Sequence, residues 1–302
     1  MKRRDFLQLG AAFVAANSVA TSIGREPISR SGPARFQVGL AAYSLRDYFS
    51  YKKGKDQKPK SDGKPIDMIG FLDYCVANEF VSAELTSYFF VPNSNDDYFL
   101  NLKREAFERG MPIAGTAIGN NFTVGKGEKL DSEIEKAIQW IDHAATLGAP
   151  HIRFFAGTAE QLAKDANRLP EAAAALNQCA EHAAKKGVYL GIENHGRLSA
   201  DQMIEIMDLM QNPWVGINLD TGNFISDDPY ADLERCVGYA VNVQVKVSMK
   251  DPDGKHYPAD LKRIGKILKD GGYQGHVILE YEDKEPYKHI PRAHEQLREA
   301  LA

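Results

Sequence analysis

The chain has 302 residues, of which 43% are apolar and 26% are charged, and its formal net charge is −4 at pH 7. This length suits one large α/β domain or two small ones, with enough apolar residues for a substantial core. The mild negative charge and the absence of a long basic run give no reason to expect a nucleic-acid partner. No apolar stretch reaches the roughly 20 residues that a membrane-spanning helix needs.

Residues 1–20 have the pattern of an export signal. A basic start that contains Arg3 and Arg4 precedes a short apolar run and a small-x-small site ending at Ala20. The segment resembles a twin-arginine signal, so we expect an exported protein, located in the periplasm of a bacterium. An amphipathic N-terminal helix is the alternative, and it is disfavoured because the residues after Leu7 have no polar face.

Two further features organise the rest of the chain. Residues 21–34 are rich in Ser, Gly and Pro and are predicted to be a flexible tether, and residues 35–302 are predicted to form the folded domain. The three cysteines, Cys75, Cys179 and Cys236, are odd in number and far apart. We interpret them as small buried hydrophobic residues.

Short apolar runs rich in β-branched residues alternate with longer helical patterns throughout the folded domain. Several of these runs are almost continuously apolar, as in parallel strands that are buried on both faces. The predicted strands are Phe36–Ala42, Ser82–Leu85, Pro112–Ile118, His151–Phe155, Tyr189–Glu193, Val215–Asp220, Val241–Val247 and His276–Glu280.

The intervening segments have apolar residues at helical spacing. The predicted helices are Pro65–Asn78, Asp97–Arg109, Leu130–Leu147, Leu169–Lys186 with Gly187 as its C-cap, Ser199–Met210, Asp228–Val237, Pro258–Asp270 and a last helix from near Pro291 to the end. Eight strands that alternate with helices predict an α/β fold of a single domain, a closed (β/α)8 TIM barrel.

An open, doubly wound sheet is the alternative to the barrel. Such a sheet would prefer a glycine-rich loop after the first strand, where this chain has Tyr43-Ser44-Leu45-Arg46. The segment 51–64, a cluster of Lys, Asp and Gly, is predicted to be a mobile loop at the mouth or on the surface.

The active site of such a barrel lies at the carboxyl ends of the strands, so polar residues at those ends are the candidates. Four of them offer oxygen ligands: Glu193, Asp220, Gln244 and Glu280. Three carboxylates that converge in a barrel mouth repel one another, and a divalent cation is the simplest relief. The pattern therefore predicts one divalent metal ion, with oxygen ligation favouring Mn, Mg or Co over a structural Zn.

Four motifs carry a resemblance to a known family: residues 191–196 (GIENHG), 218–223 (NLDTGN), 244–246 (QVK) and 279–282 (LEYE). With them the chain resembles the xylose isomerase-like barrel superfamily, in the group of sugar phosphate isomerases/epimerases. The resemblance covers nearly the whole chain after the tether.

The resemblance implies metal ligands at strand ends five to eight: a Glu, an Asp, usually a His, and a Glu. These fall on Glu193, Asp220, Gln244 and Glu280. Gln244 is the departure, because an amide oxygen is a harder and weaker ligand than imidazole and should favour a harder ion. A role for Gln244 as a hydrogen-bond partner behind the ligands stays open.

The resemblance also implies a reaction, proton transfer next to a carbonyl that the metal polarises. Glu193 and Glu280 would act as base and acid from opposite sides of the carbon. His195 lies two residues after Glu193 and would contact a substrate hydroxyl or act as a second acid or base. Lys246 shares a face with Gln244 and would stabilise an oxyanion. The alternatives are a capped loop residue for His195 and a charge partner of the carboxylates for Lys246.

The expected partner is a small-molecule carbohydrate. Five further residues at or near the strand ends are predicted to contact it: Tyr43, Glu84, Asn121, Arg153 and Asn223. The sequence leaves a homo-oligomer open.

The first hypothesis for the function is therefore a divalent-metal-dependent sugar isomerase or epimerase. The second is an exported lyase or hydrolase of 3-keto-glycosides, which begins with the same proton abstraction and then eliminates the neighbouring group. A metal-dependent DNA endonuclease is disfavoured, because the chain is acidic and has few histidines at the mouth. A non-catalytic sugar-binding barrel is the fourth alternative.

Overall fold

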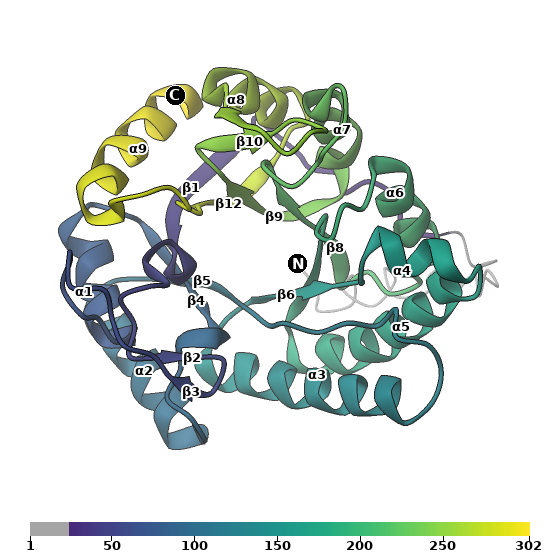
Figure 1. Ribbon diagram of the computed structural model, residues 1–302, viewed down its shortest axis with the longest axis horizontal. Coiled ribbons are helices and arrows are strands. Elements are labelled where there is room, and N and C mark those ends of the chain that lie inside the picture. The colour runs from purple at the N-terminus through teal and green to yellow at the C-terminus, as the bar shows by residue number, and fades with distance from the viewer. Residues whose placement is uncertain (1–23) are drawn as a thin grey trace, which may run out of the picture.

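The computed structural model describes residues 24–302, so the predicted export signal lies outside the described residues. Eight parallel strands close into a barrel, which confirms the predicted fold (Figure 1). Around the barrel the order is β1-β12-β9-β8-β7-β6-β5-β4. The strands are β1 (Arg35–Ala41), β4 (Ser82–Thr86), β5 (Ile113–Ala117), β6 (His151–Phe155), β7 (Tyr189–Glu193), β8 (Val215–Asp220), β9 (Ala240–Val245) and β12 (Gln274–Leu279).

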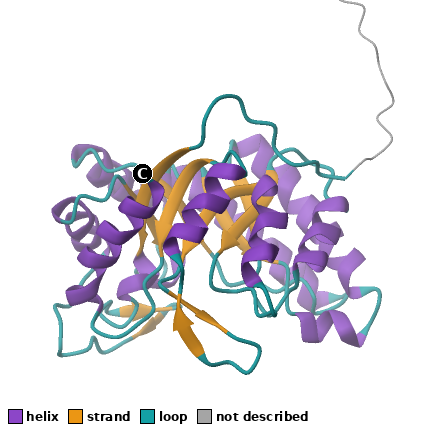
Figure 2. Ribbon diagram, turned by 90° about the horizontal axis from the view of Figure 1, so that it is seen from above, coloured by secondary structure: helices purple, strands orange, loops and turns teal. Residues whose placement is uncertain are grey.

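Helices form a ring outside the strands, as Figure 2 shows from the side. They are α1 (Met68–Ala77), α2 (Asp96–Glu108), α3 (Glu128–Leu147), α4 (Ala159–Lys164), α5 (Arg168–Lys186), α6 (Ala200–Asp208), α7 (Pro229–Cys236), α8 (Leu261–Asp270) and α9 (Pro286–Leu301), with 3-10 turns η1 (Ala42–Leu45), η2 (Ser87–Phe89) and η3 (Val237–Tyr239).

Two helix predictions need correction. The short helix α4 was not predicted, because six residues are too few to show a helical period. The last helix begins at Pro286 and not near Pro291, which lies inside it. A proline is favoured in the first turn of a helix, so Pro286 marks the start, and Pro291 only removes one backbone donor.

Local sequence signals end and begin several helices. The predicted C-cap Gly187 is confirmed: it closes α5 in the left-handed region with φ of 70°, and Gly148 closes α3 in the same way with φ of 79°. Helix α6 begins with a capping box, in which the side chains of Ser199 and Gln202 each accept a hydrogen bond from the other's backbone N–H.

Two β-hairpins lie outside the barrel, on the side where the strands end (Figure 2). The segment 51–64 was predicted as a loop, but it contains the hairpin β2 (Tyr51–Lys52) and β3 (Lys55–Asp56). Its two-residue turn has positive φ at both positions, 53° at Lys53 and 74° at Gly54, which suits a tight hairpin. The second hairpin is β10 (Ser248–Lys250) and β11 (His256–Pro258).

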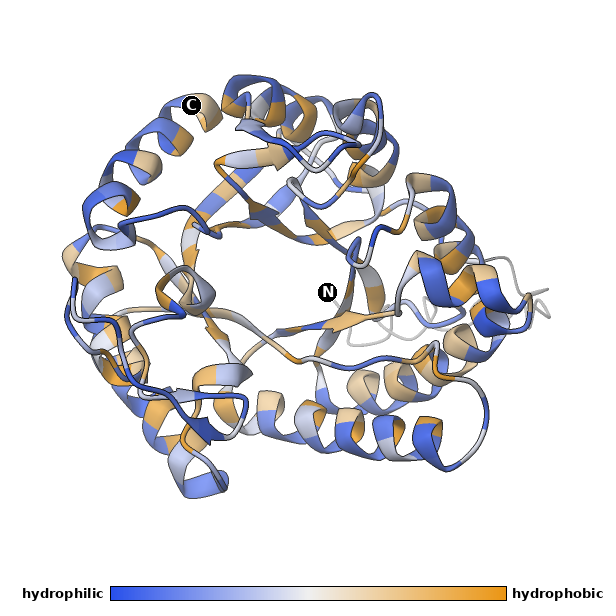
Figure 3. Cartoon of the chain, viewed as in Figure 1, coloured by the Kyte–Doolittle hydropathy of each residue, from blue (hydrophilic) through white to orange (hydrophobic). Residues whose placement is uncertain are grey.

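The apolar core lies mainly between the barrel and its helices, where the hydropathy colours of Figure 3 show apolar helix faces turned toward the strands. Inside the barrel the apolar cluster is small and consists of Ala41, Ala114 and Ile278. The three cysteines are free and buried, which confirms their interpretation as hydrophobic residues, and they are Cys75, Cys179 and Cys236.

Residues 24–34, the described part of the predicted tether, contain no helix or strand. They are hydrogen-bonded to the end of the barrel where the strands begin: Arg25 Nε donates to the carbonyl of Val215 at 3.0 Å, and the N–H of Ile28 donates to the carbonyl of Gly238 at 2.8 Å. Within residues 24–302, none of the helices combines the length and apolar character that crossing a membrane requires.

Candidate active site

A polar network fills the middle of the barrel. Gln244 on β9 donates from Nε2 to Glu84 Oε1 on β4 at 3.0 Å, although β12 and β1 lie between these two strands. Gln244 Oε1 in turn accepts a hydrogen bond of 2.6 Å from Nδ2 of Asn218, and Asn242 donates to Asn218 Oδ1 at 2.8 Å. Since these bonds cross the barrel, the four side chains point inward.

Three of the predicted acids lie together above this network, at the carboxyl ends of β7, β8 and β12. Glu193, Asp220 and Glu280 are buried, with 4%, 0% and 5% of their surface exposed. Asn194 holds Asp220 in place, because its amide donates to the Asp220 carbonyl and accepts from the Asp220 N–H, both at 2.8 Å. The Asp220 side chain also accepts from the N–H of Gly222 at 2.8 Å.

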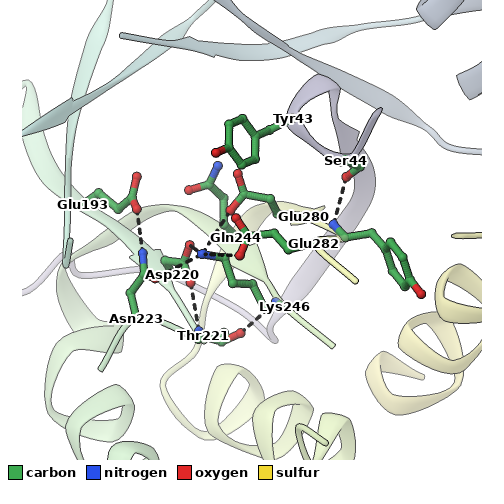
Figure 4. Close-up of polar contacts among 12 residues, drawn as sticks. Tyr43, Ser44, Glu193, Asp220, Thr221, Asn223, Gln244, Lys246, Glu280 and Glu282 are labelled. Carbon is green, nitrogen blue, oxygen red and sulfur yellow. Dashed lines mark hydrogen bonds and ion pairs between the residues drawn. The ribbon is translucent and has the colours of Figure 1, made fainter. Parts of the chain in front are cut away.

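The ammonium group of Lys246 lies between Asp220 and Glu280 (Figure 4). Its Nζ atom is 3.0 Å from Asp220 Oδ2 and 3.5 Å from Glu280 Oε2. It is also 3.5 Å from Glu282 Oε2, and it donates to Asn223 Oδ1 at 3.0 Å. Lys246 therefore offsets part of the negative charge of the acids at the end of β8 and after β12.

Glu193 has its own cationic partner. Arg153 on β6 lies with Nε 2.8 Å from Glu193 Oε2, and it donates from its terminal nitrogen to the carbonyl of Ile118 at 2.7 Å. The guanidinium lies 4.2 Å from the ring centre of Phe155. Asn223 donates to the other oxygen of Glu193 at 2.7 Å, so it bridges Glu193 and Lys246.

Burial sets the protonation of the mouth. It raises the pKa of Glu193 to about 7, against the lowering effect of Arg153. It raises the pKa of Glu280 well above its usual range, although Lys246 acts in the opposite direction. Burial lowers the pKa of Lys246, but Asp220, Glu280 and Glu282 outweigh it, and the lysine keeps its charge. A raised pKa lets a buried carboxyl take up and release a proton nearer to neutral pH, which acid–base chemistry needs.

The other residues predicted to contact the substrate differ in their distance from the acids. Tyr43 follows β1 and lies beside the carboxylates, with its ring centre 6.3 Å from that of Tyr88 (Figure 4). His195 is exposed at the rim, and its ring stacks on Phe155 at 4.1 Å. Asn121 donates to Gln161 Oε1 at 2.9 Å and accepts from Thr123, so its amide is used within the loops after β5 and β6.

The predicted four-ligand metal site is not assembled in the described residues. Both functional atoms of the Gln244 amide are engaged by Glu84 and Asn218, below the mouth. Among residues 24–302, no group of three or more His, Cys, Asp and Glu side chains is arranged to hold a metal ion. The residues as placed do not fit the cation that the resemblance implies, because a lysine lies among the acids.

Sequence reasoning missed several residues of the site. Glu282 contacts Lys246, and Asn218 and Asn242 build the network below it. The period-two pattern of a strand could have found them, since residues two positions before and after an inward side chain point inward as well.

The closed ring of eight parallel strands with helices outside it places the chain in the class of (β/α)8-barrel proteins, and its acids and lysine lie at the strand ends. The model of the family described as "Xylose isomerase-like TIM barrel" matches residues 72–302. The chain therefore belongs to this family, as its motifs indicated. Comparison with curated proteins gave no match.

Solved structures with the same fold include sugar epimerases. D-psicose 3-epimerase from Clostridium cellulolyticum H10 has a TM-score of 0.69 and 14% identity, over 88% of this chain and 99% of that one. The 3-keto-D-glucoside 4-epimerase of E. coli has a TM-score of 0.63 and 15% identity, over 88% and 100%. The IOLI protein, solved with a bound zinc atom, has a TM-score of 0.65 and 16% identity, over 87% and 96%.

Proposed function

We propose that this protein is an isomerase or epimerase of a small carbohydrate that moves a proton at a carbon next to a carbonyl. One observation carries the proposal: two buried carboxyls, Glu193 on β7 and Glu280 after β12, share the mouth with the ammonium of Lys246 after β9. The ammonium is 3.5 Å from Glu280 and is linked to Glu193 through Asn223. The epimerases among the solved structures of this fold support the substrate class.

The chemistry follows from the roles that these groups can fill. An ionised carboxylate removes the proton from the carbon, and the electron pair moves onto the carbonyl oxygen to form an enediolate. Lys246 and Arg153 are the cations near the developing negative charge, and they are held in place before the reaction. For an epimer, the protonated carboxyl returns a proton to the opposite face of the same carbon. For an isomer, it protonates the former carbonyl carbon, while the proton of the neighbouring hydroxyl passes to the former carbonyl oxygen.

We assign Glu193 as the base and Glu280 as the acid. Burial raises the pKa of Glu193 to about 7, so a share of it is ionised near neutral pH, and burial also raises the pKa of Glu280, so Glu280 takes up a proton more readily than an exposed carboxyl does. No step in this scheme uses a metal ion. The predicted dependence on a divalent cation stays a prediction.

The test is exchange of carbon-bound hydrogen with deuterated water. A panel of unphosphorylated aldoses, ketoses and 3-keto-glucosides is incubated with the protein and followed by NMR. We expect exchange in at least one sugar, reduced by about 10²- to 10⁴-fold in Glu193→Gln and Glu280→Gln. Glu160→Gln is the matched control, because Glu160 is exposed on α4 and pairs with the exposed Lys164. Exchange at the same rate in all three variants would contradict the proposal.

Cleavage of a 3-keto-glycoside is the second candidate, and one feature favours it. A groove of about 820 Å³ adjoins the mouth and is lined by Glu282, Tyr257, Tyr281 and Arg292, among others. Glu282 also contacts Lys246, so a group attached to a sugar in the mouth could extend into this groove. Release of the attached group, in place of an isomerised sugar, would identify the protein as a lyase or hydrolase.

We also propose that the protein acts outside the cytoplasm, which the Arg3-Arg4 signal supports. Free sugar phosphates are scarce there, so the substrate would be unphosphorylated. A reporter that fluoresces after twin-arginine export, fused to residues 1–34, should reach the periplasm, and Arg3→Lys with Arg4→Lys should retain it in the cytoplasm.

A further inference from the structure

The mouth of this barrel carries its own cation. We infer that the ammonium group of Lys246 takes the position of the divalent ion that the family resemblance implies, and that lysine and metal compete for the same carboxylate oxygens. The inference concerns the charge of the site and holds whichever sugar the protein acts on.

The contacts of Lys246 are those expected of a central cation. Its Nζ atom is near one oxygen each of Asp220, Glu280 and Glu282, at 3.0, 3.5 and 3.5 Å. The Asn223 carbonyl oxygen adds a fourth contact at 3.0 Å. Only 12% of the lysine side chain is exposed. The ammonium group thus donates a hydrogen bond to the Asn223 side chain and forms ion pairs with the three acids.

The loop after β8 makes room for the lysine stem. A Cβ atom at Gly222 would lie 2.7 Å from Lys246 Cδ and 3.0 Å from its Cβ, so glycine at this position lets the stem pass close to the backbone. Thr221 fixes the start of the side chain, because its hydroxyl accepts from the Lys246 N–H at 3.1 Å. The lysine therefore has a fitted path to the acids.

Gln244, one of the four expected metal ligands, is hydrogen-bonded to other side chains. The Gln244 amide donates to Glu84 and accepts from Asn218, and its residue is 1% exposed. Rotation of this amide toward the acids would remove both hydrogen bonds and leave two buried polar groups without them, which is unfavourable. Gln244 therefore supports the floor of the mouth and leaves the cation position to Lys246.

Glu193, another of the expected metal ligands, also has partners at both of its oxygens. Glu193 has one oxygen against Arg153 at 2.8 Å and the other against the Asn223 amide at 2.7 Å. The Lys246 ammonium and a divalent ion cannot both bind the oxygens of Asp220 and Glu280. In a buried site the two cations repel each other strongly when they are a few ångströms apart. Metal binding would require Lys246 to leave.

The experiment is a titration of the chelator-treated, purified chain with Mn²⁺, in the absence of sugar, with free Mn²⁺ followed by electron paramagnetic resonance. We expect Lys246→Met to bind one Mn²⁺ about tenfold or more tightly than the wild type. Lys255→Met is the matched control, because Lys255 is exposed on the turn between β10 and β11, and it should bind as the wild type does. Adding Asp220→Asn to Lys246→Met should abolish the gained site.

Two results would overturn the inference. One is a wild type that binds a single Mn²⁺ as tightly as Lys246→Met, and the other is a Lys246→Met variant that gains no affinity. Lys246→Gln, which keeps a polar side chain without the charge, replaces Lys246→Met if circular dichroism shows that the latter does not fold. Since binding is measured without sugar, its failure leaves the proposed isomerase activity standing, and inactivity toward the sugars leaves this inference standing.

Discussion

The two faces of the barrel strands differ in what they contribute. On β8, Val215, Ile217 and Leu219 pack into the apolar layer beneath the helices, whereas Asn218 and Asp220 point into the barrel. Many (β/α)8 barrels fill the interior with branched apolar side chains. Here the interior is built largely from amides and carboxyls that hold one another. The outer face supplies stability, and the inner face supplies an ordered polar floor for the site.

The largest effect on stability is expected from the outer face. Leu219→Ala removes a fully buried side chain between β8 and the helices, and it should lower the free energy of unfolding by about 3 kcal/mol. The rate of deuterium exchange per folded molecule should stay the same. Urea denaturation and the exchange assay measure the two quantities, and a stable but inactive variant would contradict this division of roles.

The next effect is pH-dependent and arises inside the barrel. Burial lowers the pKa of His151 to about 3 from an ordinary 6.5, so the folded chain keeps the ring neutral while the unfolded chain takes up a proton. The contribution of the neutral ring to the free energy of unfolding is therefore fully present above pH 6.5. Below that pH it decreases by about 1.4 kcal/mol per pH unit. His151→Gln should flatten this dependence between pH 6 and 4. Parallel pH profiles for the two proteins would show that His151 does not cause it.

A smaller loss of stability is expected when one side chain of the polar network is removed. Asn218→Ala leaves the side-chain oxygen of Gln244 without its donor and removes one acceptor of the Asn242 amide, which keeps Glu84 Oε2 at 3.4 Å. The expected cost is about 2 kcal/mol. Asn177→Ala, which removes a half-buried amide on α5 with two hydrogen bonds to backbone, serves as the control and should cost less. Equal losses in the two variants would mean that the network adds nothing beyond ordinary hydrogen bonds.

The smallest effect belongs to a helix end on the outer ring. Ser199→Ala removes the cap of α6 and should lower the free energy of unfolding by about 1 kcal/mol. Ser199→Asp, which also caps a helix, should restore most of the loss. No change on Ser199→Ala would place the capping box outside the cooperative unit that unfolds.

The difference between the faces also explains what could be predicted from sequence. The outer face and its helices produce regular apolar periods, and β6, β7 and β8 were predicted with their observed bounds. Glu193, Asp220, Glu280 and Lys246 were recognisable because strand ends meet at one edge. The direction of an amide such as Gln244 depends on partners more than 20 residues away in the chain, and no local pattern contains it.

The segment 24–34 has a practical consequence for handling the protein. Its hydrogen bonds to Val215 and Gly238 are at the end of the barrel where the strands begin, and the acids and Lys246 are at the other end. Whatever is attached ahead of residue 24 therefore joins the molecule on the side away from the mouth. An affinity matrix, a sensor surface or a fused carrier placed there would present the mouth outward, toward the bulk solution from which substrate arrives.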